Sequence, residues 1–413
     1  MMKEHTTLKE RGQALVIIAL AAVALFAFAA LAIDGSLVFS DRRHAQNAAD
    51  TSAMAAALSK VRQGTWESDG MARAASNGYD NDGTTNEVHV YNPPVDGTYA
   101  GNSQYIQVKI TSHVDTYFAR VLGFSQVTNH VEAVTRAVPS AITPLFDGNA
   151  VVGLAPHDCK AVMYQGNANT TITGSNIFVN SDCSDAAFFN NSSAANLTVP
   201  CLNSVGGITY NPGAITVSGG CLASGASPYV YPPENYYNPD VVCPAGGSQT
   251  GNSLSEGTYS GQFPPSGVEV LEGGVYCVNG DFRVNAGDTL TGNGVFIVMQ
   301  SGDVTFNGGA TIVLSAIPGP MDPDTNPYGG LLLYMPISNS GTITINGNSG
   351  SAFTGTIYAP AADVSISGTG DGGLHGQIIG YTVDLSGTSD TSIVYNNSEN
   401  WNPLIPAQIQ VAQ

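Results

Sequence analysis

Basic side chains are almost missing from the larger, C-terminal part of this chain. After Lys160 the only Lys or Arg is Arg283, although the sequence has 413 residues and a formal net charge of −19 at pH 7. Binding to nucleic acid requires several cationic side chains on one surface, because each of them neutralises a phosphate. The charge distribution therefore excludes nucleic acid as a partner.

Charges of either sign are scarce as well. Asp, Glu, Lys and Arg together make up 11% of the residues, whereas glycine occurs 48 times. A typical globular domain has about 25% charged residues and proportionately fewer glycines. The composition argues against an ordinary helical cytosolic enzyme and favours short strands joined by turns.

Signatures of common catalytic and metal sites are missing too. The sequence has no C-x-x-C pair, no histidine at a zinc-ligand spacing, no P-loop, and no G-x-S-x-G next to a suitable histidine and acid. We therefore expect a protein that is not an enzyme and that uses no cofactor.

One long apolar run is present near the N-terminus, beginning at Ala14 and ending at Ile33 (ALVIIALAAVALFAFAALAI). As a helix with ~1.5 Å rise per residue it spans roughly 30 Å, the thickness of a bilayer's hydrocarbon core. We predict a transmembrane helix here, behind a cytoplasmic leader at residues 1–13. A cleaved signal peptide is the alternative, since residues 27–29 and 30–32 both fit the small-x-small cleavage pattern.

Six cysteines follow the apolar run, and all are disulfide candidates: Cys159, Cys183, Cys201, Cys221, Cys243 and Cys277. An even number of cysteines behind a membrane segment fits disulfides outside the cytoplasm. Six cysteines allow 15 pairings, of which we favour the sequential one; six buried free thiols are the alternative. Basic residues flank the run on both sides, so the cysteines and the long C-terminal part decide the orientation. We predict a single-pass cell-membrane protein with its C-terminal region extracytoplasmic, at the cell surface.

The apolar run continues into a second helical stretch without proline, so we predict one continuous helix within residues 14–63. Its outer half carries a stripe of small residues, Ala45, Ala49, Ala53 and Ala57. Small residues allow the close approach of another helix. We interpret the stripe as a face for a partner helix; packing against the chain's own next domain is the alternative.

Fixed polar residues around the run carry a resemblance to a known family. Arg11 and Gly12 precede the run, Asp34 follows it, and QNAAD at residues 46–50 leads into the alanines. Over roughly residues 10 to 60 this order resembles the N-terminal segment of TadG-like proteins of the Tad/Flp pilus-assembly system. The resemblance implies pilus-assembly proteins or pilins as partners, together with the membrane. Related prepilins carry Glu at the fifth position after the cleavage-point glycine, where this chain has Ile17, so the likeness does not extend to prepilin processing.

Residues 64–143 have the pattern of a small α/β module. Apolar and polar residues alternate at 87–91, 105–111 and 126–138, as they do in half-buried strands. Residues 71–79 and 114–124 have helical patterns.

Residues 144–413 repeat short phrases of β-branched residues closed by glycine, such as TITG, VTFNGG, ITING and VDLSG. Repeats of about 20 residues with glycine and asparagine at the corners are typical of a β-solenoid. The region resembles Gly/Asn-rich β-helix modules of bacterial surface proteins, and a β-sandwich is the alternative. Between residues 200 and 265 the repeat fades into Pro- and Tyr-rich sequence, which predicts a long ordered loop or a cap. The predicted fold class is therefore α+β and multidomain: a transmembrane helix, a small α/β module and a large all-β solenoid.

Two groups of side chains are candidates for chemistry in the solenoid. Asp281 and Asp303 are one coil apart, and carboxylates on neighbouring rungs lie ~5 Å apart, close enough for acid/base work on a polysaccharide. Arg283 is the only basic residue nearby, so two solvated aspartates are the simpler interpretation. Asp322, Asp324 and Asn326 have the spacing of a calcium loop but lack its glycine and its final glutamate.

These features predict a membrane-anchored, surface-exposed, non-enzymatic protein of Tad/Flp-type pilus assembly or adhesion. The solenoid would offer a long acidic surface to a partner such as a surface glycan. The alternatives are a surface β-helix enzyme that degrades polysaccharide and a structural envelope protein unrelated to pili.

Overall fold

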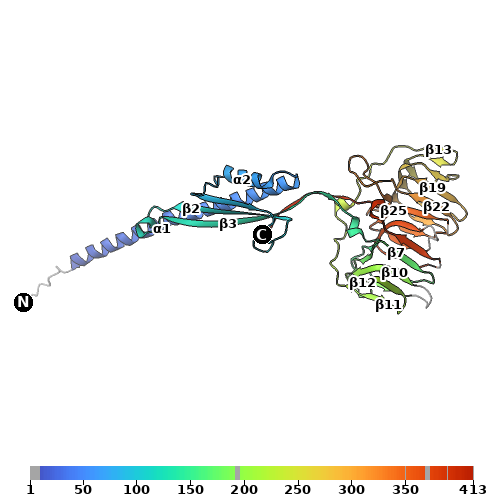
Figure 1. Ribbon diagram of the computed structural model, residues 1–413, viewed down its shortest axis with the longest axis horizontal. Coiled ribbons are helices and arrows are strands. Elements are labelled where there is room, and N and C mark those ends of the chain that lie inside the picture. The colour runs from blue at the N-terminus through green and yellow to red at the C-terminus, as the bar shows by residue number, and fades with distance from the viewer. Residues whose placement is uncertain (1–9, 191–195, 349, 368–372, 388, 413) are drawn as a thin grey trace, which may run out of the picture. The chain divides into compact units, whose positions relative to one another are not determined.

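The computed structural model describes residues 10–412 except 191–195, 349, 368–372 and 388. The chain divides into two compact units (Figure 1). The first unit contains Met1–Ala141 together with Pro406–Gln413, and the second contains Ile142–Ile405. Most of the predicted leader, residues 1–9, lies outside the described residues.

A single helix, α1 (Glu10–Val61), opens the first unit. Its 52 residues contain no proline, and the helix runs through Gly35 without interruption. At ~1.5 Å per residue it is roughly 78 Å long. The predicted continuous helix is therefore confirmed.

The rest of the first unit is a four-stranded antiparallel sheet with the order β1-β2-β3-β31. Its strands are β1 (Asn86–Tyr91), β2 (Tyr105–Asp115), β3 (Gln126–Val138) and β31 (Gln408–Ala412). The outer half of α1 and the short helix α2 (Trp66–Ser76) pack against this sheet. Alternating side chains such as Ile106, Val108 and Ile110 point into the shared core, as strand periodicity requires.

Two predicted helices of this unit differ from the structure. Residues 114–124 do not form a helix, because β2 continues to Asp115 opposite Gln126 of β3. The segment is the tip of the β2–β3 hairpin and contains one 3₁₀ turn, η1 (Ala119–Leu122), which ends at Gly123 with φ +95°. The helix predicted at 71–79 starts earlier, at Trp66, and ends at Ser76.

The last strand of the chain belongs to the first unit. β31 pairs with β3 in the register Val138↔Gln408 to Val134↔Ala412. The solenoid therefore does not extend to Gln413 as expected; it ends at Ile405 and is inserted between two neighbouring strands of one sheet. A separate two-stranded ribbon of β4 (Ala141–Ile142) and β30 (Leu404–Ile405) lies at the ends of this insertion.

The second unit is a β-solenoid of about 10 turns. Its strands pair in parallel with equivalent strands of the neighbouring coils, for example Val364 with Val383, 19 residues later. Parallel pairing between successive coils distinguishes this fold from the β-sandwich alternative, whose strands are antiparallel. Among the described residues the parallel strands form three walls, and four long strands belong to both the first and the second wall.

The strands of each wall follow a fixed stacking order. The first wall contains β12 (Ile215–Ser224), β10 (Leu197–Ser204), β7 (Thr170–Thr173), β29 (Thr391–Val394), β27 (Leu374–Gly380), β25 (Ala352–Ala359), β22 (Thr311–Ser315), β19 (Thr289–Asn293), β16 (Val270–Leu271) and β14 (Ser253–Leu254), with β13 (Gln249–Thr250) antiparallel to β14. The second wall contains β12, β10, β8 (Ile177–Val179), β5 (Val151–Gly153), β27, β25, β23 (Leu331–Tyr334), β20 (Val295–Ser301), β17 (Gly274–Asn279) and β15 (Gly257–Ser260). The third wall contains β11 (Ile208–Tyr210), β9 (Ala187–Phe189), β6 (Val162–Tyr164), β28 (Val383–Asp384), β26 (Asp363–Ile366), β24 (Thr342–Ile345), β21 (Val304–Phe306) and β18 (Phe282–Val284).

The coils do not stack in the order in which they occur along the chain. The chain enters the solenoid in the middle, at β5 and β6, and builds toward the end formed by β11 and β12 (Figure 1). It then crosses to the opposite end, at β13 to β15, and builds back until β27 and β28 pair with β5 and β6. Two runs of coils therefore meet at a seam inside the stack.

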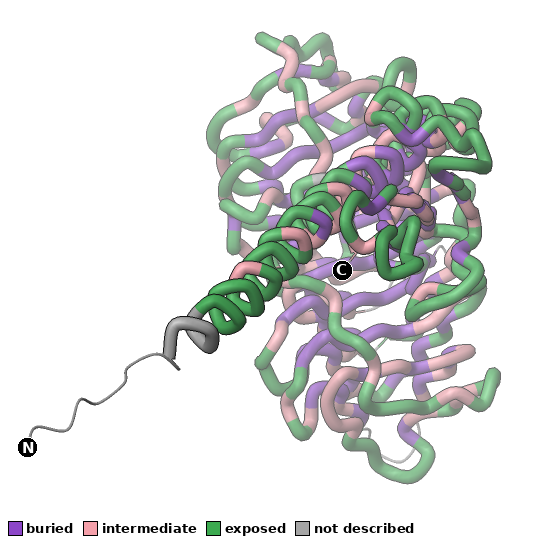
Figure 2. The backbone as a smooth tube through the Cα atoms, turned by 90° about the vertical axis from the view of Figure 1, so that its left-hand side faces the viewer, coloured by how far each residue is buried: buried purple, intermediate pink, exposed green. Residues whose placement is uncertain are grey.

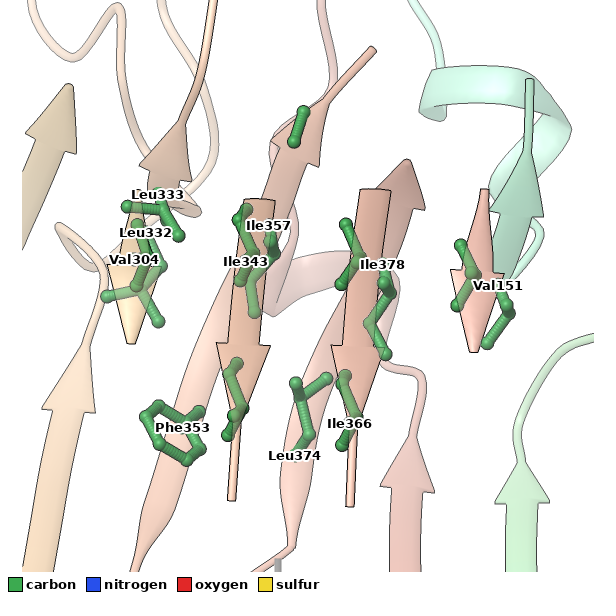
Figure 3. Close-up of a cluster of buried hydrophobic side chains, with 14 of the residues drawn as sticks. Val151, Val304, Leu332, Leu333, Ile343, Phe353, Ile357, Ile366, Leu374 and Ile378 are labelled. Carbon is green, nitrogen blue, oxygen red and sulfur yellow. The ribbon is translucent and has the colours of Figure 1, made fainter. Parts of the chain in front are cut away.

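Columns of identical or similar apolar side chains fill the interior. On the third wall Val304, Ile343, Val364, Val383 and Val162 occupy one register column, and all five are buried. Figure 3 shows how such side chains from adjacent strands face a common core. Each buried aliphatic side chain of this size stabilises the fold by about 1.5–3 kcal/mol.

Candidate functional site: the membrane anchor and its clasps

The N-terminal part of α1, residues 15–33, is apolar on every face, and the rest of the described chain leaves it largely uncovered. Large side chains such as Leu15, Leu25, Phe26 and Phe28 are about two-thirds or more exposed, and Figure 2 shows this stretch as exposed. Among the described residues, α1 is the one helix that is long and apolar enough to cross a membrane. A core helix of a soluble protein would be buried, so this stretch is a candidate membrane anchor.

Polar side chains of α1 fasten the helix to the β2–β3 hairpin and, near its C-terminal end, to the loop between β1 and β2, and we call these contacts clasps. The first clasp is Asp34, one residue beyond the apolar run. Its carboxylate accepts hydrogen bonds from the backbone N–H groups of Tyr117 (2.9 Å), Phe118 (3.0 Å) and Ala119 (2.7 Å). These amides start the η1 turn and have no helical partner of their own, so a carboxylate is well suited to satisfy them.

The second clasp is Asp41, two turns further along α1. Its carboxylate accepts hydrogen bonds from Asn129 Nδ2 (2.8 Å), from the Ser112 hydroxyl and from the Tyr79 hydroxyl (3.1 Å). Asn129 also donates to the Val38 carbonyl of α1 (3.2 Å). Burial and the neighbouring Asp41 charge raise the pKa of Tyr79, so its hydroxyl remains a donor at neutral pH.

Two further clasps lie nearer the end of α1. Gln46 Nε2 donates to the Glu132 carbonyl of β3 (2.9 Å) and to Asp50 Oδ1 (3.0 Å). The Lys60 ammonium donates to Asn92 Oδ1 (3.0 Å) and to the Ser103 carbonyl, and burial lowers its pKa. The Lys60 clasp thus binds the loop between β1 and β2, whereas the other three clasps bind the β2–β3 hairpin.

The alanine stripe is buried inside the first unit. Ala45, Ala49, Ala53 and Ala57 are fully buried in one core cluster with residues of β1, β2, β3 and α2. The prediction of a partner-helix face is therefore wrong for these residues, and the alternative, packing against the chain's own next domain, is what the structure shows. The fit is close, because a Cβ on Gly70 of α2 would lie 3.1 Å from the Ala56 Cβ.

Asp34 and Gln46 are among the polar residues that carry the family resemblance, whereas Asp41 and Lys60 were not predicted as functional residues. Asp34, Val38, Asp41 and Ala45 follow one another at intervals of three or four residues and so share one helix face. A polar residue in line with a small-residue stripe was the signal that could have identified Asp41.

The cysteines form three disulfides in sequential order, as expected. Cys159 bonds Cys183, Cys201 bonds Cys221, and Cys243 bonds Cys277, with Cα–Cα distances of 5.2, 4.8 and 5.7 Å. The second disulfide joins paired positions of β10 and β12 at one end of the stack. Disulfides persist in oxidising compartments, so these bonds suggest an extracytoplasmic location for the second unit.

The third disulfide fixes the Pro- and Tyr-rich segment, which is a long ordered loop, one of the two predicted forms, and is not a cap. Residues 226–243, which we call the strap, pack on outward-facing aromatic residues of the second wall, among them Phe178 and Tyr334. Asn180 exchanges hydrogen bonds with the backbone of Tyr229 at one end (2.7 and 3.1 Å). At the other end the Tyr328 hydroxyl donates to the Asp240 carbonyl (2.9 Å). The strap carries the chain from one end of the stack to the other.

The two candidate catalytic aspartates lie on neighbouring rungs but support the backbone. Asp281 Oδ1 accepts the backbone N–H of Asp303 (3.2 Å), and Asp303 Oδ1 accepts the backbone N–H of Thr342 (2.7 Å). Arg283 instead lines a hollow of about 300 Å³ together with Glu269 and Asp288. The carboxylates form a ladder at a corner of the solenoid.

The candidate calcium residues form a turn. Asp322 Oδ1 accepts the backbone N–H groups of Asp324 and Thr325, both at 2.9 Å, and these bonds, that of Thr325 foremost, hold the pKa of Asp322 below its ordinary value. The Asn326 amide donates to the Pro318 and Pro320 carbonyls (both 3.1 Å). The side chains thus stabilise the loop's own backbone.

The anchor, the clasps and the disulfides define a class of protein: a candidate single-span membrane protein whose small α/β module carries a disulfide-bearing β-solenoid. The anchor segment is similar to a known family. Residues 12–59 match the family described as putative Flp pilus-assembly TadE/G-like, in agreement with the resemblance read from the sequence. The match covers α1 from just before the apolar run to the end of the alanine stripe, and it supports a pilus-related role. No curated protein and no solved structure matches the chain.

Proposed function

We propose that this protein is a membrane-anchored, non-enzymatic component of a Tad/Flp-type pilus system that acts in assembly or in surface attachment. One observation carries the proposal. The segment that matches the pilus-assembly family is the same segment that forms the candidate anchor and the clasped helix. The solenoid is then the part that the anchor holds in place.

The proposed mechanism is mechanical. The apolar part of α1 holds the chain in the membrane, with the N-terminus inside and both folded units outside. The clasps join helix and hairpin, so a load on the sheet is passed to the membrane helix through several hydrogen bonds. Both ends of the solenoid segment continue into β3 and β31, which pair with each other. A pull on the solenoid therefore acts on two strands of one sheet.

The solenoid is proposed to contact a partner through its surface. After Lys160 this region has a single basic residue, so its surface is acidic and rich in Asn, Ser and Thr. Such a surface favours a cationic or hydroxyl-rich partner, such as a pilin, an assembly protein or a surface glycan. We propose a binding role without catalysis because one carboxylate oxygen of each of Asp281 and Asp303 accepts a hydrogen bond from the backbone of a neighbouring rung.

Fractionation of cells tests the proposal. Filaments are sheared from intact cells, and the sheared material and the washed membranes are probed for this protein. We expect it in one of these fractions, with the solenoid open to external protease. Recovery with filaments would indicate a subunit or tip adhesin, and retention in membranes would indicate an anchor or assembly factor.

Three outcomes would contradict the proposal. Soluble protein in the medium, absent from both fractions, would mean that residues 14–33 are a cleaved signal. An unchanged amount and location in cells that lack the pilins and the assembly ATPase, with no co-purification of pilus components, would favour an envelope protein unrelated to pili. Cleavage of purified surface polysaccharide by the intact protein would support the enzyme alternative.

A further inference from the structure

Large apolar side chains are exposed at the tip of the β2–β3 hairpin. Within residues 116–125 the exposed members are Tyr117, Phe118, Val121, Leu122 and Phe124, and we call this group the tip patch. Val121 and Leu122 are 86% and 79% exposed. Isolated apolar residues on a surface are ordinary, but a contiguous group of this size marks a contact surface.

The Asp34 clasp fixes the tip patch beside the end of the apolar run. The Asp34 carboxylate binds three successive backbone amides of the tip, and η1 contacts α1. Asp34 directly follows Ile33, the last residue of the apolar run. Both partners belong to the first unit, and the last large apolar residues of the run, Leu31 and Ile33, are exposed as the patch is.

We infer that the tip patch is a second membrane contact, which inserts into the interfacial layer of the bilayer where the α1 span ends. This inference rests on the proposed membrane anchoring by residues 14–33. If these residues fill the hydrocarbon core, Asp34 lies within a turn, or about 5 Å, of its boundary. The patch held by Asp34 is therefore at the depth of the lipid headgroups and upper acyl chains.

The composition of the tip fits that environment. Aromatic residues are enriched at the membrane interface, where Tyr can keep its hydroxyl in the headgroup layer while its ring is in apolar surroundings. Arg120 lies between the apolar residues with its side chain 61% exposed, 3.7 Å from Asp115 at the surface. A side chain of this length can reach lipid phosphate while its neighbours are inserted.

A second contact has a consequence that a single helix lacks. One transmembrane helix can tilt and rotate about its own axis at little cost. A patch beside the helix, at a fixed depth, restricts both motions. The tip patch would thus set the orientation in which the first unit stands on the membrane.

Tryptophan fluorescence in lipid tests the inference on the full chain. Leu122→Trp is reconstituted in nanodiscs made either of ordinary lipid or of lipid brominated in the upper acyl chain, with Trp66 and Trp401 as the constant background. Val95→Trp is the matched control, since Val95 is also exposed (57%) in a loop of the same unit. That loop is next to Asn92, which is bonded to Lys60, roughly 39 Å along α1 from Asp34.

We expect the probe at position 122 to lose most of its added emission in brominated lipid and to emit at shorter wavelength than the probe at position 95, which should be unaffected. Adding Asp34→Asn, which places an amide N–H₂ against the backbone donors, should reduce the quenching at position 122 while the protein stays in the membrane.

Other results would overturn the inference. An unquenched probe at position 122, in protein that still resists alkaline extraction, would exclude lipid contact and leave the anchor intact. If that probe were also shielded from iodide in water, the tip patch would be covered by protein instead. Release of the protein by alkali would show that the anchor itself is wrong, and the inference would fall with it.

Discussion

Asp34 illustrates how a polar residue at the end of an apolar helix acquires its role from a distant segment. Its partners begin with Tyr117, 83 residues later in the chain. The sequence marked Asp34 and Gln46 as fixed features of a resemblance, but no local pattern identifies the amides or carbonyls to which they bind. The alanine stripe was recognised from its spacing. Its partner could not be predicted, because small residues fit a neighbouring strand as well as a neighbouring helix.

A larger residue in the alanine stripe should destabilise the first unit. Ala53 is fully buried between α1 and the sheet, so Ala53→Leu should lower the free energy of unfolding by about 1–3 kcal/mol through overpacking. Thermal unfolding in detergent, followed by the fluorescence of Trp66, measures the change. Met54→Leu, at a position that is 48% exposed, is the control and should stay within about 0.5 kcal/mol. Equal effects of the two substitutions would contradict the assigned packing.

At the scale of elements, the hairpin tip shows why a helical pattern can mislead. Its apolar residues at 117, 118, 121 and 122 have the spacing of an amphipathic helix. In the structure these side chains are exposed, and the strands of the hairpin extend toward them from both sides. Hydrophobic periodicity indicates that side chains share a face. It does not indicate whether that face packs against the rest of the protein. The strap is a second example. Its tyrosines indicate that the segment is partly buried, but they do not indicate which wall of the solenoid it packs against.

The strap should depend on its disulfide. Cys243 bonds Cys277 across a separation of 34 residues, and loss of such a bond costs about 2–4 kcal/mol. In the Cys243→Ser/Cys277→Ser variant we expect the strap to open and chymotrypsin to cut after Tyr229 and Tyr237, sites that are protected in the parent. Mass spectrometry of the fragments locates the cuts. The Cys159→Ser/Cys183→Ser variant is the control, and cleavage of its strap at a similar rate would show that the Cys243–Cys277 bond has no special role.

At the scale of the whole molecule, the solenoid is an insertion in a small module. The repeat predicted a solenoid because alternating β-branched residues and corner glycines describe one coil. It could not predict the stacking order, since the rungs are chemically alike and any rung can pair with any other through the same backbone bonds. The pairing of β31 with β3 was missed because a five-residue strand separated from its partner by the whole solenoid carries little local signal.

The first unit should fold without the solenoid. Val138 and Gln408 are paired neighbours, so residues 139–141 and 406–407, joined through a linker of about 4–6 residues in place of residues 142–405, would form a short loop between the two strands. We expect the shortened chain to keep the helical and strand signals of the module and the environment of Trp66, as measured by circular dichroism and fluorescence in detergent. The control lacks Pro406–Gln413 as well, and it should be less stable because β3 loses its neighbour. An unfolded shortened chain would show that the solenoid is needed for folding.

The seam between the two runs of coils has a consequence for the time at which the protein becomes complete. As the chain is synthesised from the N-terminus onward, β5 and β6 emerge early, yet their partners β27 and β28 are among the last strands to appear. Until then one edge of the earliest coil has unpaired backbone N–H and C=O groups. Such an edge can pair with strands of other chains. The closing strands lie only a short distance before β31. The closing strands and β31 therefore become available at nearly the same time. Completion of the stack thus coincides with the pairing of β31 with β3, which ties both ends of the solenoid to the first unit.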